Sequence, residues 1–559
     1  MKTRKFCEDR EPQTAHRFAD IHCHPHMRTF NWLHKPWKPQ KTKKYNPWWI
    51  ILPKFKSSAK GLRASAYSQC DMAQITNGNL KLAIISLYPL EKGWVTGRKN
   101  PIKGRPVDLQ KVLGDNAFND VVSDGVSVAA KGVFHLLGED KGGAPALRDL
   151  VQAIFMKLPL RKINFYQSRR YDYFKELKRE REFLLSANDR EMETEVYVPA
   201  LKKVAFNRQR IKKKCPLELD AKGKYVFAKS GKHAREIIDR GDTAFIMSIE
   251  GANVFNSEDS FEEIKKKIME VKGWEQPLFF ITFTHHFYNY LAGHAHSIPD
   301  IGTKLIDQEE GINSGITEKG MQVIRLLLGL DKDNNIDKSL GRRVLLDVKH
   351  LSVVARKEYF EKIIMPCYKK GDVIPVIASH VAYSGVKTQQ ELIDNLDKEI
   401  DGAVAKDAEG NEFNRWNINI CDEDAVMVFR TGGVIGINLD QRILAIPKED
   451  QEKEDTHIRY VWQNMKAIME AVLNSKETGL PAKEKVTDLV CLGTDFDGYI
   501  DPANKYATVN DFGKLREDLV EAIGKDPDKD KLLFGLTPDQ LAEKICFTNA
   551  LDFVMRSFK

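Results

Sequence analysis

Histidines and carboxylates follow several short apolar runs of this chain. The first run ends in Asp-Ile-His-Cys-His, which places His22 and His24 two residues apart and on the same side of an extended strand. Glu250, His350 and His380 each follow a later run. Imidazole nitrogens and carboxylate oxygens are ligands for Zn²⁺, and they also bind Mn²⁺, Co²⁺ or Fe²⁺. These residues therefore predict a site for two divalent ions, with zinc as the first expectation and Glu250 placed to bridge them.

Each of these residues also has a purely structural interpretation. A single buried histidine is usually hydrogen-bonded within the core, and a single aspartate after a strand more often forms a turn or caps a helix. Buried titratable groups that gather in one place, however, are costly unless they are paired or bound to metal. We expect the weaker candidates in the same segments to be supporting or surface residues: His26, His286, His294 and His296.

Eight short apolar runs are the elements that must position these side chains. Continuous rather than alternating apolar runs favour parallel strands covered by helices, because both faces of each strand are then buried. Segments with helical periodicity lie between them, which indicates repeated βαβ units. The runs are residues 18–21, 82–87, 244–249, 278–283, 344–348, 374–378, 434–437 and 489–492.

Eight parallel strands predict an α/β fold, a (β/α)8 TIM barrel. In such a barrel the carboxyl ends of all strands open onto one face, where active sites lie. We expect a single elaborated domain over residues 1–559, with long insertions at about 29–80, 90–200 and 387–414. The first insertion carries a stretch rich in Trp, Pro and Lys, which we interpret as a flap over the barrel mouth.

The composition excludes several classes of protein. With 559 residues, 42% hydrophobic and 30% charged, the chain is folded rather than intrinsically disordered. A formal net charge of +8 is small for this length, so we expect no nucleic-acid partner. The eight cysteines form no CxxC pair, which argues against a disulfide framework. No signal peptide or long apolar run is visible, so we expect a cytoplasmic protein without a membrane span; a homo-oligomer stays an open alternative.

Seven motifs at the ends of the predicted strands read DIHCH, SIEG, TFTH, LLDVKH, PVIASH, GGVIGIN and LGTDFDG in chain order. This order resembles the membrane (renal) dipeptidase family, a group of binuclear zinc peptidases within the amidohydrolase superfamily. The resemblance implies that the barrel is of the metallo-dependent hydrolase type. The C-terminal segment GLTPDQLAEKICFTNALDFVMRSF is similar to the closing helices of that family. The resemblance implies that His22 and His24 hold one metal ion, that His350 and His380 hold the other, and that Glu250 bridges.

The resemblance also implies roles in catalysis and substrate binding. His285 would contact the substrate carbonyl or its tetrahedral oxyanion, and Asp495 would transfer the proton. Tyr88, in the second-strand motif ISLYP, is a candidate for substrate binding. The arginine that clamps the substrate carboxylate in the family is missing from its expected place, and Arg415, three residues earlier, is the substitute candidate.

Three further departures from the family pattern bear on the substrate. The first strand carries His-x-His where the dipeptidases usually have His-x-Asp, which changes the charge at the first metal ion. Lys349 stands where a Ser is usual, and its ammonium would disturb the second ion unless it points away. The three long insertions have no counterpart in compact members and would reshape or cap the pocket.

The expected function is metal-dependent hydrolysis of the amide bond of a dipeptide or N-acyl amino acid. Two divalent ions would share a water, lower its pKa toward about 7, and deliver the bridging hydroxide to the carbonyl. Two alternatives stay open. One is another reaction of the amidohydrolase superfamily, on a lactone, cyclic amide or phosphoester, and the other is a non-catalytic barrel that acts as a scaffold.

Overall fold

The computed structural model describes residues 15–33, 46–51, 68–96, 160–197, 219–298, 306–398, 403–407, 410–451 and 453–559. Most of the Trp-, Pro- and Lys-rich stretch expected to form a flap lies outside the described residues, as does the greater part of the insertion at 90–200. The strands and helices of the predicted barrel lie within the described ranges.

All eight apolar runs form strands, and these strands follow one another in chain order around a parallel sheet. Every residue of the first and of the third strand of this path is buried, which explains why their sequences do not alternate between apolar and polar residues. The prediction of a (β/α)8 TIM barrel is confirmed. The strands are β1 (Phe18–Cys23), β3 (Leu80–Leu87), β8 (Thr243–Glu250), β9 (Leu278–Thr282), β10 (Leu345–Asp347), β11 (Ile377–Val381), β14 (Val434–Ile437) and β15 (Val490–Leu492).

Hydrogen bonds between the first strand and the segment after the last one close the ring. The backbone N–H of His24 donates to the carbonyl of Phe496 over 2.9 Å, and the N–H of Asp495 donates to the carbonyl of His22 over 2.9 Å. The buried carboxylate of Asp20 accepts bonds from the N–H of His22 and from the N–H and hydroxyl of Thr494. The closure therefore fixes His22, His24 and Asp495 relative to one another.

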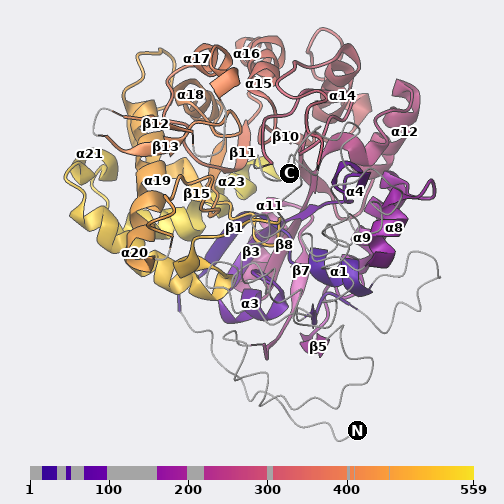
Figure 1. Ribbon diagram of the computed structural model, residues 1–559, viewed down its shortest axis with the longest axis horizontal. Helices are drawn as coiled ribbons and strands as arrows, with labels where there is room; N and C mark the ends of the chain where they lie inside the picture. The colour runs from indigo at the N-terminus through magenta and orange to yellow at the C-terminus, as the bar shows by residue number, and fades with distance from the viewer. Residues whose placement is uncertain are drawn as a thin grey trace, which may run out of the picture.

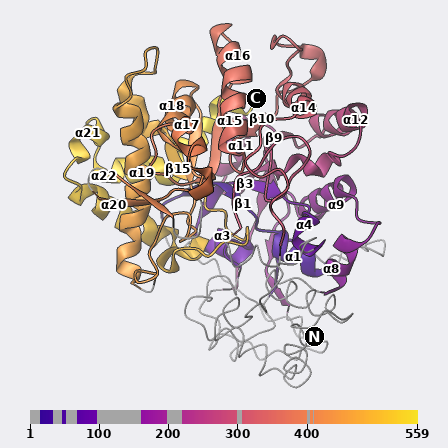
Figure 2. The same cartoon turned by 45° about the horizontal axis from the view of Figure 1, so that its top comes forward.

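Helices surround the strands in both views of the molecule (Figures 1 and 2). Side-chain caps mark several of their starts, as where the hydroxyls of Ser260 and Thr317 accept bonds from the first turns of α12 and α14. The principal helices outside the ring are α3 (Met72–Asn77), α11 (Gly231–Asp239), α12 (Phe261–Lys272), α14 (Glu318–Leu328), α15 (Val353–Tyr359), α16 (Met365–Lys369), α18 (Asp422–Arg430), α19 (His457–Leu473), α20 (Phe512–Lys525), α21 (Lys529–Leu533), α22 (Pro538–Glu543) and α23 (Asn549–Ser557). Within the described ranges, no helix has both the length and the apolar character needed to cross a membrane.

The described parts of the insertions add short elements beside the barrel. Strand β2 (Trp49–Ile51) of the first insertion pairs in parallel with β5 (Glu195–Tyr197) of the second, so the two insertions contact each other. Strand β7 (Tyr225–Phe227) pairs with the first residues of β8, and β9 pairs with the same strand from Met247 onward. The other elements are α1 (Met27–Leu33), α4 (Gly93–Thr96), α8 (Leu160–Gln167), α9 (Tyr173–Leu185), β4 (Met192–Glu193), β6 (Lys222–Gly223), α17 (Gln389–Ile393), β12 (Val404–Lys406) and β13 (Glu412–Asn414).

We expect Gly436→Ala to destabilise the barrel. A Cβ atom on Gly436, in β14, would lie 2.0 Å from the carbonyl oxygen of Ser379 and 2.9 Å from the side chain of Ile21. Overpacking of this kind costs about 1–3 kcal/mol of unfolding free energy. Gly524→Ala, in α20, is the matched control, because its Cβ would meet only Pro538 at 3.9 Å. Urea denaturation should show a lower midpoint for Gly436→Ala alone, and equal midpoints would contradict this packing.

Candidate metal centre

The carboxylate of Glu250 lies at the centre of a buried cluster of histidines. Glu250 ends β8 and is 2% exposed. The histidines come from β1 and the residue directly after it, from β11 and from the segments after β9 and β10. Glu250 Oε1 lies 3.4 Å from Nε2 of His22, 3.5 Å from those of His285 and His380 and 3.6 Å from that of His350, and Glu250 Oε2 lies 3.2 Å from Nε2 of His24. The structure thus brings together the five residues predicted as metal ligands, and His285 with them.

The spacing of these atoms suits metal ligands. Two nitrogen atoms bound at 2.0–2.1 Å to one tetrahedral zinc ion are about 3.3 Å apart. The Nε2 atoms of His22 and His24 are 3.2 Å apart, and so are those of His350 and His380. Glu250 Oε1 has no hydrogen-bond partner among the described residues, although four imidazoles surround it. A buried carboxylate oxygen without a partner, between two nitrogen pairs, is a donor set that fits a pair of divalent ions.

Hydrogen bonds on the far side of the rings leave Nε2 free for such ions. Nδ1 of His24 lies 3.1 Å from the backbone carbonyl of Ser86, which can only accept, so this nitrogen carries the proton. Nδ1 of His380 lies 2.7 Å from the hydroxyl of Ser379, and that of His22 lies 3.2 Å from it. The hydroxyl donates its own proton to Asp347, so it accepts from both rings. This pattern, in which Nδ1 is held by an acceptor, is usual for histidines that bind metal through Nε2.

Asp347 accepts hydrogen bonds from Ser379, whose hydroxyl contacts the rings of His22 and His380. Its Oδ1 accepts the backbone N–H groups of Lys349 and Ser379, and its Oδ2 accepts the hydroxyls of Thr282 and Ser379. Both oxygens are therefore occupied by two donors each. The charge of Asp347 thus reaches the histidine rings through the hydroxyl of Ser379.

The buried charges shift the pKa values of the cluster in different directions. Burial lowers the pKa of His350 and of His380 well below the usual range, which keeps both rings in the neutral form that binds metal. Burial acts in the same direction on His24, but the carboxylates of Asp495 and Glu250 outweigh it and raise that pKa. Burial would raise the pKa of Glu250, and the surrounding histidines instead hold it well below its usual value.

Asp495 lies at the edge of the cluster, after β15. Its Oδ1 is 3.5 Å from Nε2 of His24 and 3.8 Å from Nε2 of His22, and its Oδ2 accepts a long hydrogen bond from the amide of Asn438. Its backbone has a φ of +62°, and that of His350 a φ of +65°. This left-handed conformation costs free energy in residues other than glycine, and it occurs often at functional sites. Asp495 is the more exposed carboxylate, with 13% of its side chain accessible against 2% for Glu250.

Lys349 and the two candidates for substrate binding differ in their positions. Burial lowers the pKa of Lys349 to about 8, and Asp495 is the strongest charge that opposes this. The ammonium in turn lowers the pKa values of His350 and His380, so it favours their neutral forms. The ring of Tyr88 lies 4.6 Å from that of His285. Arg415 is half-buried beside β13, and no contact within the described residues joins it to the cluster.

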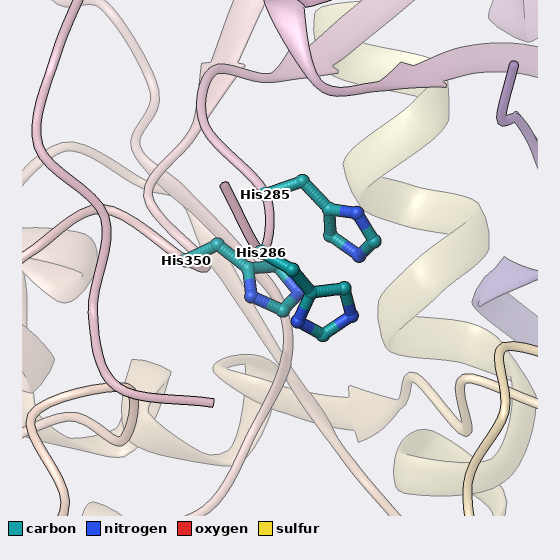
Figure 3. A group of neighbouring side chains, drawn as sticks. All are labelled: His285, His286 and His350. Carbon is teal, nitrogen blue, oxygen red and sulfur yellow. The ribbon is translucent and has the colours of Figure 1, made fainter. Parts of the chain in front are cut away.

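The weaker histidine candidates lie around the cluster. His286 is the nearest, with its ring centre 3.8 Å from that of His285 and 5.0 Å from that of His350, and Figure 3 shows the three rings together. These three form a further group whose nitrogens could hold an ion, although Nδ1 of His286 also contacts the hydroxyl of Ser297 at 2.7 Å. His26 pairs with the buried carboxylate of Glu180, and His294 contacts backbone carbonyls. His296 packs edge-on against Trp416.

One residue that sequence reasoning missed is Glu91, whose carboxylate contacts Nδ1 of His285 at 2.8 Å. Glu91 follows the second apolar run in the segment LYPLEKGW. The signal that could have found it is the one that found the others, a titratable residue close after a barrel strand.

No family model matches the chain, and no curated protein matches it. The solved structures that are similar to it include dipeptidase AC, described as a metallopeptidase, with 15% identity, a TM-score of 0.38 and coverage of 60% of this chain and 72% of that one. A metallopeptidase from Rhodobacter sphaeroides, liganded with a phosphinate mimic of L-Ala-D-Ala, has 16% identity, a TM-score of 0.37 and coverage of 60% and 69%. The probable dipeptidase PvdM from Pseudomonas aeruginosa has 13% identity, a TM-score of 0.36 and coverage of 68% and 80%. At these values, any assignment of function to this chain rests on its own side chains.

We expect Asp347→Asn to destabilise the protein, because the amide –NH2 would face donors where a carboxylate oxygen now accepts two bonds. Leaving buried donors unpaired costs about 1–3 kcal/mol. Thr282→Val removes one of the four donors and leaves the carboxylate in place, so its cost should be smaller. Unfolding free energies from urea titration measure both. A larger loss of unfolding free energy in Thr282→Val than in Asp347→Asn would contradict the supporting role of Asp347.

Proposed function

We propose that the chain is a metal-dependent hydrolase that cleaves the amide bond of a dipeptide or N-acyl amino acid. The observation that carries the proposal is the partnerless Oε1 of Glu250 with four imidazole Nε2 atoms 3.4–3.6 Å away. The Nδ1 atoms of His24 and His380 face acceptors, so the neutral form of either ring turns the lone pair of its Nε2 toward this carboxylate. A pair of divalent ions, zinc by preference, satisfies all of these groups together.

His22 and His24 would hold one ion, His350 and His380 the other, and Glu250 would bind both. When bound, such ions lower the pKa of a water molecule and polarise the carbonyl of the substrate. Among the candidate ligands only Glu250 is charged, which suits a carboxylate shared between two cations.

The remaining residues would move protons and hold charge. Asp495 would take a proton from the attacking water as the oxygen–carbon bond forms, and would give it to the amine nitrogen as the carbon–nitrogen bond breaks. Its greater exposure supports this role, since a proton carrier must reach the substrate. His285 would donate from Nε2 to the carbonyl oxygen as it becomes negative. The carboxylates of Glu250 and Glu91 raise the pKa of His285 against the effect of burial, which favours the protonated ring that such a donor needs.

The substrate class rests on the order of the seven strand-end motifs, which resembles that of the membrane dipeptidases. Lys349 is a better candidate than Arg415 for binding a substrate carboxylate. Asp495 is the strongest charge that opposes the effect of burial on the pKa of Lys349, whereas no described contact brings Arg415 to the cluster.

The purified protein should contain two equivalents of transition metal per chain, as measured by elemental analysis. His380→Ala should retain one equivalent, because it removes a nitrogen from the pair with His350. His233→Ala, on α11 outside the cluster, is the matched control and should retain two. A wild-type protein that binds no Zn²⁺ after incubation and dialysis would exclude the proposed centre.

Asp495→Asn should keep both equivalents of metal and lose turnover by roughly 10²–10⁴-fold, the usual contribution of a general base and acid. The assay is hydrolysis of a panel of dipeptides and N-acyl amino acids, run beside lactones and phosphodiesters. Asp497→Asn is the control, because the Oδ2 of Asp497 is occupied by Ser68 and by the backbone N–H of Gln69. It should lower stability more than turnover. Full activity of Asp495→Asn would refute the proton-transfer role, and activity on lactones or phosphodiesters alone would refute the substrate class.

A further inference from the structure

Glu91 is a buried carboxylate with four hydrogen-bond donors around it. It lies between β3 and α4 and is 2% exposed. Its Oε2 contacts Nδ1 of His285 at 2.8 Å and accepts bonds from the hydroxyl of Tyr88 at 3.2 Å and the backbone N–H of His286 at 3.3 Å. Its Oε1 accepts the backbone N–H of Phe287 at 3.2 Å. The carboxylate thus ties the end of the second strand to the loop after the fourth.

These contacts determine which nitrogen of His285 faces the histidine cluster. An ionised carboxylate only accepts hydrogen bonds, so Nδ1 of His285 must carry the proton. Nε2, on the other side of the ring, lies 3.5 Å from Glu250 Oε1 in the centre of the histidine cluster. The backbone bonds to His286 and Phe287 hold the loop beside Glu91, and the bond to Nδ1 fixes the orientation of the His285 ring on that loop.

The neighbouring carboxylate of Glu180 provides a contrast. Glu180, on α9, is also buried, and its Oε1 accepts the backbone N–H of Tyr88 at 2.9 Å and pairs with His26. It supports the same strand end as Glu91, and none of its described contacts is with His285. A purely structural role at this strand end would therefore be shared by both residues, whereas an effect on His285 belongs to Glu91.

We infer that Glu91 is a positioning residue: its Oε2 accepts the N–H of Nδ1 of His285, which holds the ring so that the N–H of Nε2 faces the oxygen of the scissile carbonyl. The second half of this inference rests on the proposed function, and the first half does not. The Glu91–His285 pair is then a two-residue unit in which the carboxylate acts on the substrate only through the imidazole.

The first test is the protonation of His285, read by ¹⁵N NMR of protein labelled at histidine, with His285→Ala assigning the signal. The wild-type signal should report a protonated Nδ1. Glu91→Gln should shift that signal, because a neutral amide is a weaker acceptor than a carboxylate for the proton on Nδ1. Glu180→Gln should retain it. An unprotonated Nδ1 in the wild type, or an unchanged signal in Glu91→Gln, would overturn the inference whether or not the protein hydrolyses amides.

The second test is a double-mutant cycle on turnover. Glu91→Gln should lower kcat by roughly 10²-fold, with KM and metal content within about twofold of wild type, since one preorganised donor is worth about 10²–10³ in rate. Glu91→Asp, which restores the charge, should recover part of the rate. In a His285→Ala background Glu91→Gln should have no further effect. Independent, multiplicative losses would overturn the inference, and an equal fall in kcat for Glu180→Gln would assign the effect to the strand end instead.

Discussion

The site depends on one electrostatic constraint, the burial of a carboxylate and five imidazole rings in one place. Glu250 Oε1 has no hydrogen-bond partner among the described residues, and the Nδ1 atoms of His24 and His380 face acceptors, so these two rings in their neutral forms turn lone pairs toward the carboxylate. Low dielectric makes such an arrangement costly without positive charge at its centre. The barrel around it supplies the rigidity that keeps the rings from relaxing into ordinary hydrogen bonds.

The acceptors that face the Nδ1 atoms of the histidines differ in chemical type. Ser86 offers a backbone carbonyl, Ser379 a hydroxyl whose own proton is committed to Asp347, and Glu91 a full negative charge. Ser86 and Glu91 belong to β3 and the segment after it, and Ser379 belongs to β11. The imidazole rings therefore donate to three kinds of acceptor. The strongest of these, a carboxylate, faces His285, the ring to which we assign charge stabilisation rather than metal binding.

The barrel and the inner cluster could be predicted from the sequence because they follow simple rules. Parallel strands buried on both faces read as continuous apolar runs, and the residues directly after them meet at one end of the ring. The supporting residues were harder to find. Glu91 acts on His285 across 194 positions, and Glu180 belongs to a helix of an insertion, so no periodicity connects either residue to the site. The position of Arg415 could not be predicted either, since it depends on the path of a loop rather than on a strand end. The weaker histidines could not be placed for the same reason. Whether the ring of His286 faces His285 or solvent depends on the bend of the backbone at His286 and Phe287.

The bonds that close the ring link residues far apart in synthesis. Asp20 and Thr494 are 474 positions apart. At about 5–20 residues per second, translation separates their emergence by something on the order of a minute. Throughout that interval the first strand has no partner on one edge, and the pair His22 and His24 exists before the carboxylates that will surround it. The histidine cluster is therefore among the last features of the nascent protein to be completed, and any ion captured earlier by the two histidines would be held by them alone.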